Sequence, residues 1–233
     1  MLSNSEIEEL GAGIVGKFYG ESLEDRTNVD IEALAREFFR LTIVTEKMAG
    51  TDRDKIGFLS DGLTWLTVKR GPESVEILYP RNTVVISCDI ENGRKNFTIA
   101  HETAHYALEK YDPQAACFQS EFKPWIGCSS KDYEENISNA ESQANRLASS
   151  LLMPEKMVKK ALAENGRPGK VPMFGKNAFL PADKAMLRKL KEQLGVSYQA
   201  LVIRLEAMGR IEHRNYDEYL ALMMGDRDAE AGM

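Results

Sequence analysis

Apolar positions near the start of the chain recur at helical spacing. A stripe over residues 4–18 is formed by side chains three or four positions apart: Ile7, Leu10, Ile14 and Phe18. This spacing places them on one face of a helix. A polar stretch follows, and Asp30 is a suitable N-cap for a second helix that extends through Phe39.

Between residues 41 and 90 the pattern changes to short β-branched or aromatic runs. The runs are Leu41–Val44, Gly57–Leu59, Leu63–Val68, Val75–Leu78 and Thr83–Cys88. They are separated by Gly, Pro, Asp and Asn, which favour tight turns. This alternation predicts a small, mostly antiparallel sheet.

Helical spacing returns in two segments that flank a long polar stretch. The first begins after Asn92-Gly93 and runs to about Lys110, and the second spans about Ser138–Met153. Between them, Tyr111–Asn136 shows no clear period. Pro154 then suits the first turn of another helix.

The last third of the chain is predicted to be helical after a connector rich in Gly and Pro at residues 165–181. Two helices, Asp183–Leu194 and Ser197–Met208, flank Gly195 in an arrangement similar to a helix–turn–helix. The fold class is therefore expected to be α+β, with the sheet packed against helices.

Three divisions of the chain are expected. Residues 1–165 would form the main domain, 166–225 a helical C-terminal segment and 226–233 a flexible tail. A length of 233 residues suits this organisation, because such a chain can bury a sizeable core.

Composition and charge narrow the class of protein. With 43% hydrophobic and 28% charged residues the chain is typical of a globular protein. A formal net charge of −6 argues against a general nucleic-acid binder. Three cysteines without metal-type spacing favour a reducing cytoplasm, and neither a signal peptide nor a membrane span is recognisable.

The segment with the most specific chemistry is His101-Glu102-Thr103-Ala104-His105, an H-E-x-x-H motif that contains two of the three histidines. Residues four apart lie on one face of a helix, so both imidazoles can bind one cation. Glu102 lies close enough to act on a water molecule beside that cation. This is the arrangement of a zinc peptidase.

The pentapeptide alone also occurs by chance, so its surroundings matter. Both histidines fall within an apolar helical stripe that contains Phe97, Ala100, Ala104 and Leu108. Two neighbouring buried imidazoles are costly unless they are hydrogen-bonded or bind a metal. The alternative, two histidines of the core or surface with a solvated Glu102, is therefore less favoured.

A catalytic zinc usually has a third protein ligand. His213 is far along the chain, and Glu134 and Glu135 lie in the polar stretch. Glu141 begins a helix whose residues at offsets of three, seven and eleven are apolar: Ala144, Ala148 and Leu152. A carboxylate on that buried face needs a partner, although an exposed glutamate that complements the helix dipole is the alternative.

Two linked blocks carry a resemblance to a known family. The first runs from Asn96 to His105 and the second from Glu141 to Ala148, with Leu151-Leu152-Met153-Pro154 closing the same helix. Together they resemble the ImmA/IrrE family of metallopeptidases, whose pattern is F-T-x-A-H-E-x-x-H followed by E-x-x-A-N-x-x-A and L-L-M-P. Thr103-Ala104 replaces the commoner Leu-Gly, and the segment after Lys110 is long for the family.

The resemblance implies roles for individual residues. His101, His105 and Glu141 would bind Zn2+, and Glu102 would be the catalytic base, in a zincin-like fold with a helical C-terminal part. It also implies an endopeptidase of a bacterial cell or mobile element that cuts a helix–turn–helix transcriptional repressor. Tyr106 and His213 are both candidates to stabilise the oxyanion.

Other interpretations stay open. Cys117 or Cys128 could reach the metal, although the simpler interpretation is that both are ordinary thiols of a loop or of the core. Residues 155–210 contain 12 Lys/Arg against 5 Asp/Glu, an excess of +7, so direct DNA binding by the last helices is possible but less favoured than packing. A regulatory DNA- or protein-binding module with a structural metal is therefore the alternative function, and a small-molecule hydrolase is a third.

Overall fold

A computed structural model describes residues 2–23, 25–111 and 130–230. Contacts divide the chain into two compact units, Met1–Pro154 and Glu155–Met233. Both units combine helices with small sheets, which confirms the α+β class. No helix in the described ranges is long and apolar enough to cross a bilayer.

Both helices predicted near the N-terminus are present. Helix α1 (Asn4–Tyr19) begins with a capping box in which the Ser3 hydroxyl accepts from the Glu6 amide and the Glu6 carboxylate accepts from the Ser3 amide. A 3-10 turn, η1 (Gly20–Leu23), follows. Helix α2 (Ile31–Ala33) is capped by Asp30 as expected and continues as a π-helical turn, η2 (Leu34–Phe38).

The predicted strands form two small sheets in the first unit. Strands β1 (Thr42–Glu46), β5 (Thr83–Ser87) and β2 (Gly57–Leu59) form a three-stranded sheet in that order. Strands β3 (Trp65–Arg70) and β4 (Glu73–Leu78) form an antiparallel pair, and a 3-10 turn, η3 (Gly50–Asp52), precedes β2. Pairing is antiparallel between β2 and β5 but parallel between β1 and β5.

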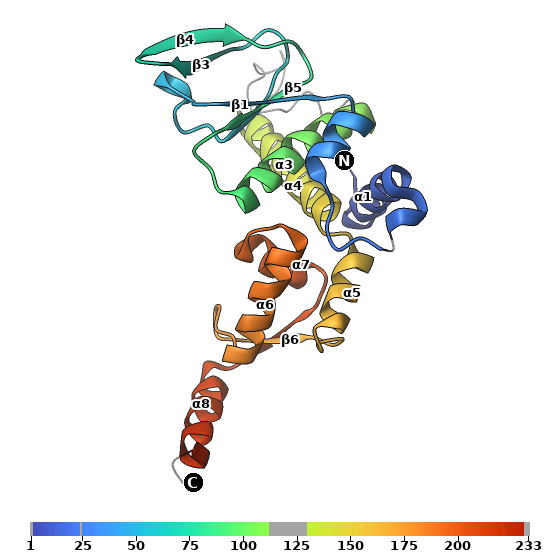
Figure 1. The fold of residues 1–233 in the computed structure, drawn as a ribbon, viewed down its shortest axis with the longest axis vertical. Coiled ribbons are helices and arrows are strands. Elements are labelled where there is room, and N and C mark those ends of the chain that lie inside the picture. Colours follow the sequence, from blue (N-terminus) through green and yellow to red (C-terminus); the bar gives the residue numbers. More distant parts are fainter. Residues whose placement is uncertain (1, 24, 112–129, 231–233) are drawn as a thin grey trace. The chain divides into compact units, whose positions relative to one another are not determined.

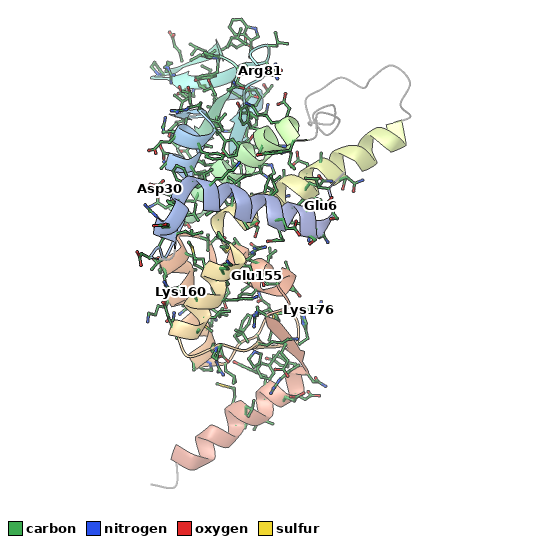
Figure 2. All side chains as sticks on the ribbon, turned by 90° about the vertical axis from the view of Figure 1, so that its right-hand side faces the viewer. Glu6, Asp30, Arg81, Glu155, Lys160 and Lys176 are labelled. Carbon is green, nitrogen blue, oxygen red and sulfur yellow. The ribbon has the colours of Figure 1, made fainter. Side chains whose placement is uncertain are left out.

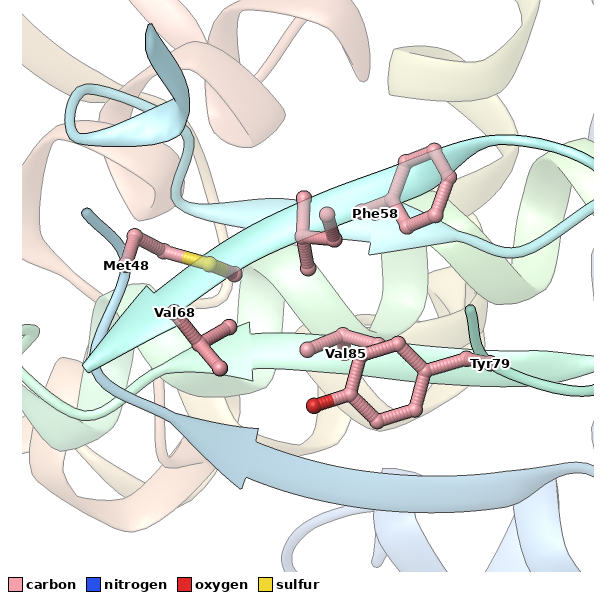
Figure 3. Close-up of a cluster of buried hydrophobic side chains, with 6 residues drawn as sticks. Met48, Phe58, Val68, Tyr79 and Val85 are labelled. Atoms are coloured by element: carbon pink, nitrogen blue, oxygen red, sulfur yellow. The ribbon is translucent and has the colours of Figure 1, made fainter. Parts of the chain in front are cut away.

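The strand pair packs on the sheet through an apolar cluster (Figure 3), which consists of Met48, Phe58, Leu66, Val68, Tyr79 and Val85. Every residue of β5 is buried, as expected for a central strand covered on both faces. The cluster covers one face of β5, and helix α3 (Asn92–Tyr111) packs against β5 and β2.

Helices α3 and α4 (Ser130–Leu152) lie side by side, and α1 packs on α4 (Figure 1). The approach of α1 to α4 is close at Gly11, where an added Cβ would lie 2.4 Å from Ser150 Oγ. The sheet and these helices place the H-E-x-x-H segment between β2 and α4.

The second unit contains the predicted helices and three further elements. Helices α5 (Glu155–Glu164), α6 (Pro181–Leu194) and α7 (Tyr198–Ala207) match the sequence pattern, and Gly195 ends α6 in the left-handed conformation. Strands β6 (Val171–Phe174) and β7 (Ile211–Arg214) pair in parallel, and α8 (Tyr216–Glu230) follows. The sequence pattern did not predict β6, β7 or α8.

An ion pair joins the two sheets of the first unit. The Arg70 guanidinium donates two hydrogen bonds to the buried Glu46 carboxylate, one of them 2.6 Å long, and the Tyr79 hydroxyl donates a third at 2.7 Å. The hydrogen bonds from Arg70 lower the pKa of Glu46 against the opposing effect of burial. Burial and the bond to Glu46 raise the pKa of Tyr79 to about 12.

Glu46→Gln is expected to lower the free energy of unfolding at pH 7, because Arg70 and Tyr79 lose a charged hydrogen-bond acceptor. Arg70 is half exposed and solvent screens its charge, so the expected loss is about 2 kcal/mol. A carboxyl with a lowered folded pKa contributes stability above its unfolded pKa and loses it as the pH falls through the folded pKa. The difference from wild type should therefore shrink at about pH 3. Denaturant unfolding at both pH values checks this, with the exposed Glu76→Gln as control; a pH-independent difference would contradict it.

Candidate metal centre

Helices α3 and α4 bring together the three residues predicted to bind a metal. The ring nitrogens His101 Nε2 and His105 Nε2 are 3.0 Å apart. Glu141 Oε2 lies 3.3 Å from His101 Nε2, and Glu141 Oε1 lies 3.3 Å from His105 Nε2. The three donor atoms form a compact group within 4.8 Å of one another.

The local sequence explains why these side chains meet. On α3 the two histidines are four residues apart and both are mostly buried, as the apolar stripe predicted. On α4 the stripe that follows Glu141 is buried, as expected: Ala144, Ala148 and Leu152. Glu141 itself lies at the edge of this stripe, with its side chain 35% exposed. It therefore reaches the histidines while facing the cleft.

The distances between these donors suit one small cation. Two ligands, each about 2.1 Å from a tetrahedral zinc ion, lie about 3.4 Å apart. The observed separations of 3.0, 3.3 and 3.3 Å are close to that value. Two imidazole nitrogens and a carboxylate oxygen are also a donor set that Zn2+ prefers.

Asn145, one helical turn after Glu141, fixes the orientation of His101. Its amide oxygen lies 3.1 Å from His101 Nδ1, so that nitrogen donates and carries the proton. When His101 is neutral, as a metal ligand must be, the lone pair of Nε2 faces His105 and Glu141; when it is protonated, Nε2 donates a hydrogen bond to Glu141. A ligand histidine commonly has such a partner on its second nitrogen.

The electrostatics favour positive charge at this point. Hydrogen bonds from His101 and His105 hold the pKa of Glu141 well below its usual value. Burial, the largest single effect, lowers the pKa of His101, but the hydrogen bond to Glu141 and the charges of Glu102 and Glu141 outweigh it, so the pKa is raised. A field that stabilises an imidazolium also attracts a divalent cation.

Glu102 faces the same cleft but lies outside the donor group. Burial raises the pKa of its carboxyl, although the nearby His105 and His101 and a hydrogen bond from the Leu59 backbone oppose this rise. The cleft has a volume of about 420 Å³. It is lined by residues of α3 and α4 and by the segment around β2: Lys55, Ile56, Gly57, Phe58, Leu59, Asp61, Phe97, Thr98, His101, Glu102, His105, Glu141 and Asn145.

Two other sequence candidates, Tyr106 and His213, are not among the residues that line this cleft. Tyr106 is buried with its ring 5.9 Å from that of Phe39, and it does not line the cleft. His213 belongs to β7 of the second unit, where it lies 3.1 Å from Glu206.

Four further candidates have side chains outside the described part of the structure. Cys117 and Cys128 fall outside the described residues. Glu134 and Glu135 lie in the first part of α4, and their side chains are outside the described part.

Sequence reasoning missed two features of the site. Asn145 had a usable signal, because it stands four residues after Glu141 and therefore shares its helix face. No sequence signal could have identified Gly57 and Leu59 as part of the cleft, because the approach of β2 to α3 depends on non-local packing.

Comparison with known proteins gives a family. The sequence profile described as the IrrE N-terminal-like domain, a peptidase family, matches residues 39–206. No curated protein matches the chain. Among solved structures, a Mycobacterium tuberculosis transcriptional regulator is similar with a TM-score of 0.47 and 13% identity, over 87% of this chain and 48% of that one. The chain spans about half the length of that protein. Because the profile covers well over half of the residues of this chain, the chain belongs to the peptidase family of the IrrE N-terminal-like domain.

Proposed function

We propose that the chain is a zinc-dependent endopeptidase. The observation that carries the proposal is the convergence of His101, His105 and Glu141 within 4.8 Å of one another, in a cleft that also contains Glu102. Membership of a peptidase family supports the same reaction class.

The proposed roles follow from the chemistry of each side chain. His101, His105 and Glu141 hold the zinc ion, and Asn145 orients His101. When bound, zinc supplies Lewis-acid polarisation of the scissile carbonyl and makes a neighbouring water more acidic. The Glu102 carboxylate accepts a proton from the attacking water and passes it to the leaving amine.

The edge strand that lines the cleft suits binding of an extended peptide. Strand β2 is at the edge of the three-stranded sheet and lines the cleft, so the backbone groups on its free side, apart from the Leu59 amide that is bonded to Glu102, could pair with a substrate. The proposed substrate is a helix–turn–helix transcriptional repressor in the bacterial cytoplasm. The resemblance to the ImmA/IrrE peptidases supports this choice.

Direct DNA reading by α7 is disfavoured by its surface. The exposed side chains of α7 include Gln199, Ile203 and Glu206, whereas Arg204, its single cation, is 1% exposed. A recognition helix needs polar or cationic groups that reach base edges. The exposed cations of this unit, such as Lys160 and Lys176, are on other segments (Figure 2) and form a solvated face or a docking surface for an acidic partner.

Metal removal tests the proposal. The zinc-loaded chain is expected to cut the repressor encoded beside its gene at a defined site, and chelation should lower the rate at least about 100-fold until zinc is restored. Electrophoresis and mass spectrometry of the products, with metal analysis of each sample, check this. Cleavage that persists in metal-free protein would contradict a zinc peptidase. Cleavage of unrelated peptides but not of the repressor would overturn the substrate class alone.

A further inference from the structure

The carboxylate of Glu102 lies against the free side of β2. The Ile56 carbonyl accepts from the Ser87 amide at 3.0 Å, and the Ser60 amide donates to the Thr83 carbonyl at 2.8 Å. Alternate residues of an antiparallel strand bond to the same neighbour, so Gly57 and Leu59 direct their backbone groups away from β5. The Leu59 amide is bonded to Glu102 instead.

Gly57 leaves the space that this contact requires. A Cβ added at Gly57 would lie 2.9 Å from Glu102 Oε1 and 2.3 Å from Thr98 Cγ2. The backbone of Gly57 is not in the left-handed region, so any residue could adopt its conformation. Glycine is therefore required here for close approach of β2 to α3, not for an unusual turn.

We propose that Gly57 and the Leu59 amide are positioning groups for Glu102, which extends the proposed function and rests on it. A glutamate side chain has several rotamers, and a general base must be held in one of them. The Leu59 amide occupies one acceptor site of the carboxylate and leaves others for a water in the cleft. The missing side chain at position 57 lets the carboxylate reach that amide.

A side chain at position 57 would have two effects: it would disturb the packing of β2 on α3, and it would displace the Glu102 carboxylate. Two variants separate these effects. Gly57→Ala should lower the denaturation midpoint and also lower kcat by about 100-fold, since a displacement of about 1 Å can have that effect. Adding Thr98→Ser removes the methyl group closest to the new Cβ. The double variant should regain most of the midpoint but not kcat, with KM and zinc stoichiometry unchanged.

Gly11→Ala is the matched control for packing alone. Its Cβ would lie 2.4 Å from Ser150 Oγ and 2.8 Å from Ser150 Cβ, between α1 and α4. It should lower the denaturation midpoint while each folded molecule keeps the wild-type kcat. A wild-type kcat in the Gly57→Ala, Thr98→Ser variant would overturn the positioning role.

Amide hydrogen exchange supplies a readout that does not depend on peptidase activity. In the zinc-loaded wild-type protein the Leu59 amide should exchange far more slowly than the Gly57 amide, which faces the same side of β2. This protection should be lost in Glu102→Ala and in the Gly57→Ala, Thr98→Ser variant. Equal exchange of the two amides in the wild type would overturn the positioning role and leave the zinc peptidase standing. Absence of cleavage by the wild type would instead count against the proposed function.

Discussion

Glu102→Gln is expected to abolish peptide cleavage while the protein keeps its zinc. Gln has nearly the same shape as Glu, but its amide cannot take a proton from water at neutral pH. Loss of a general base commonly costs about 10²–10⁴-fold in rate. Zinc content should not change, because Glu102 is outside the donor group of His101, His105 and Glu141.

The same substitution should stabilise the metal-free fold at pH 7. Burial raises the pKa of Glu102, and an acid whose folded pKa exceeds its unfolded value destabilises the protein once the pH is above the unfolded value. A neutral amide removes that penalty. A loss of activity accompanied by a higher free energy of unfolding is typical of a group kept for function.

Glu109→Gln is the control for this substitution, since Glu109 is on the same helix. It forms an ion pair of 2.7 Å with Arg81, which is 66% exposed, and such surface pairs contribute about 0–1 kcal/mol. Its cleavage rate and zinc content should match the wild type. Initial rates and metal analysis of both variants decide the matter: a Glu102→Gln protein that cuts at the wild-type rate would remove Glu102 from the role of base.

Local spacing explains which parts of the site the sequence predicts. The positions of His101 and His105 follow from the geometry of a single helix, and the side of α4 that Glu141 occupies follows from the apolar residues after it. The strands of the first unit were predicted because turn residues separate them. Each of these inferences depends on neighbours within about one to three helical turns.

Features that depend on distant residues were not predictable in this way. Strand β6 has four residues inside a stretch rich in Gly and Pro, and it pairs with β7 through contacts such as Val171 with Ile211, 40 positions along the chain. The parallel pairing of β1 with β5 likewise spans the whole region that contains β2, β3 and β4. The close approach of Gly57 to Glu102 is of the same kind, because it depends on how the sheet packs on α3.

The third ligand is tested by Glu141→Ala, which is expected to weaken zinc binding on the order of a thousand-fold. Zinc affinity in small proteins is about 12 kcal/mol, so one of three ligands accounts for about 4 kcal/mol. Cleavage at limiting zinc should fall with occupancy. Titration of metal-free protein with zinc against a competing chelator measures the affinity directly.

Glu109→Ala is a close match for this change, because the Glu109 side chain is 31% exposed and that of Glu141 is 35% exposed. The control should bind zinc as the wild type does, so a difference between the two variants reports on the ligand and not on the loss of a surface carboxylate. Unchanged affinity in Glu141→Ala would mean that another donor completes the site. Glu134 and Glu135, earlier on the same helix, would then be the next residues to replace.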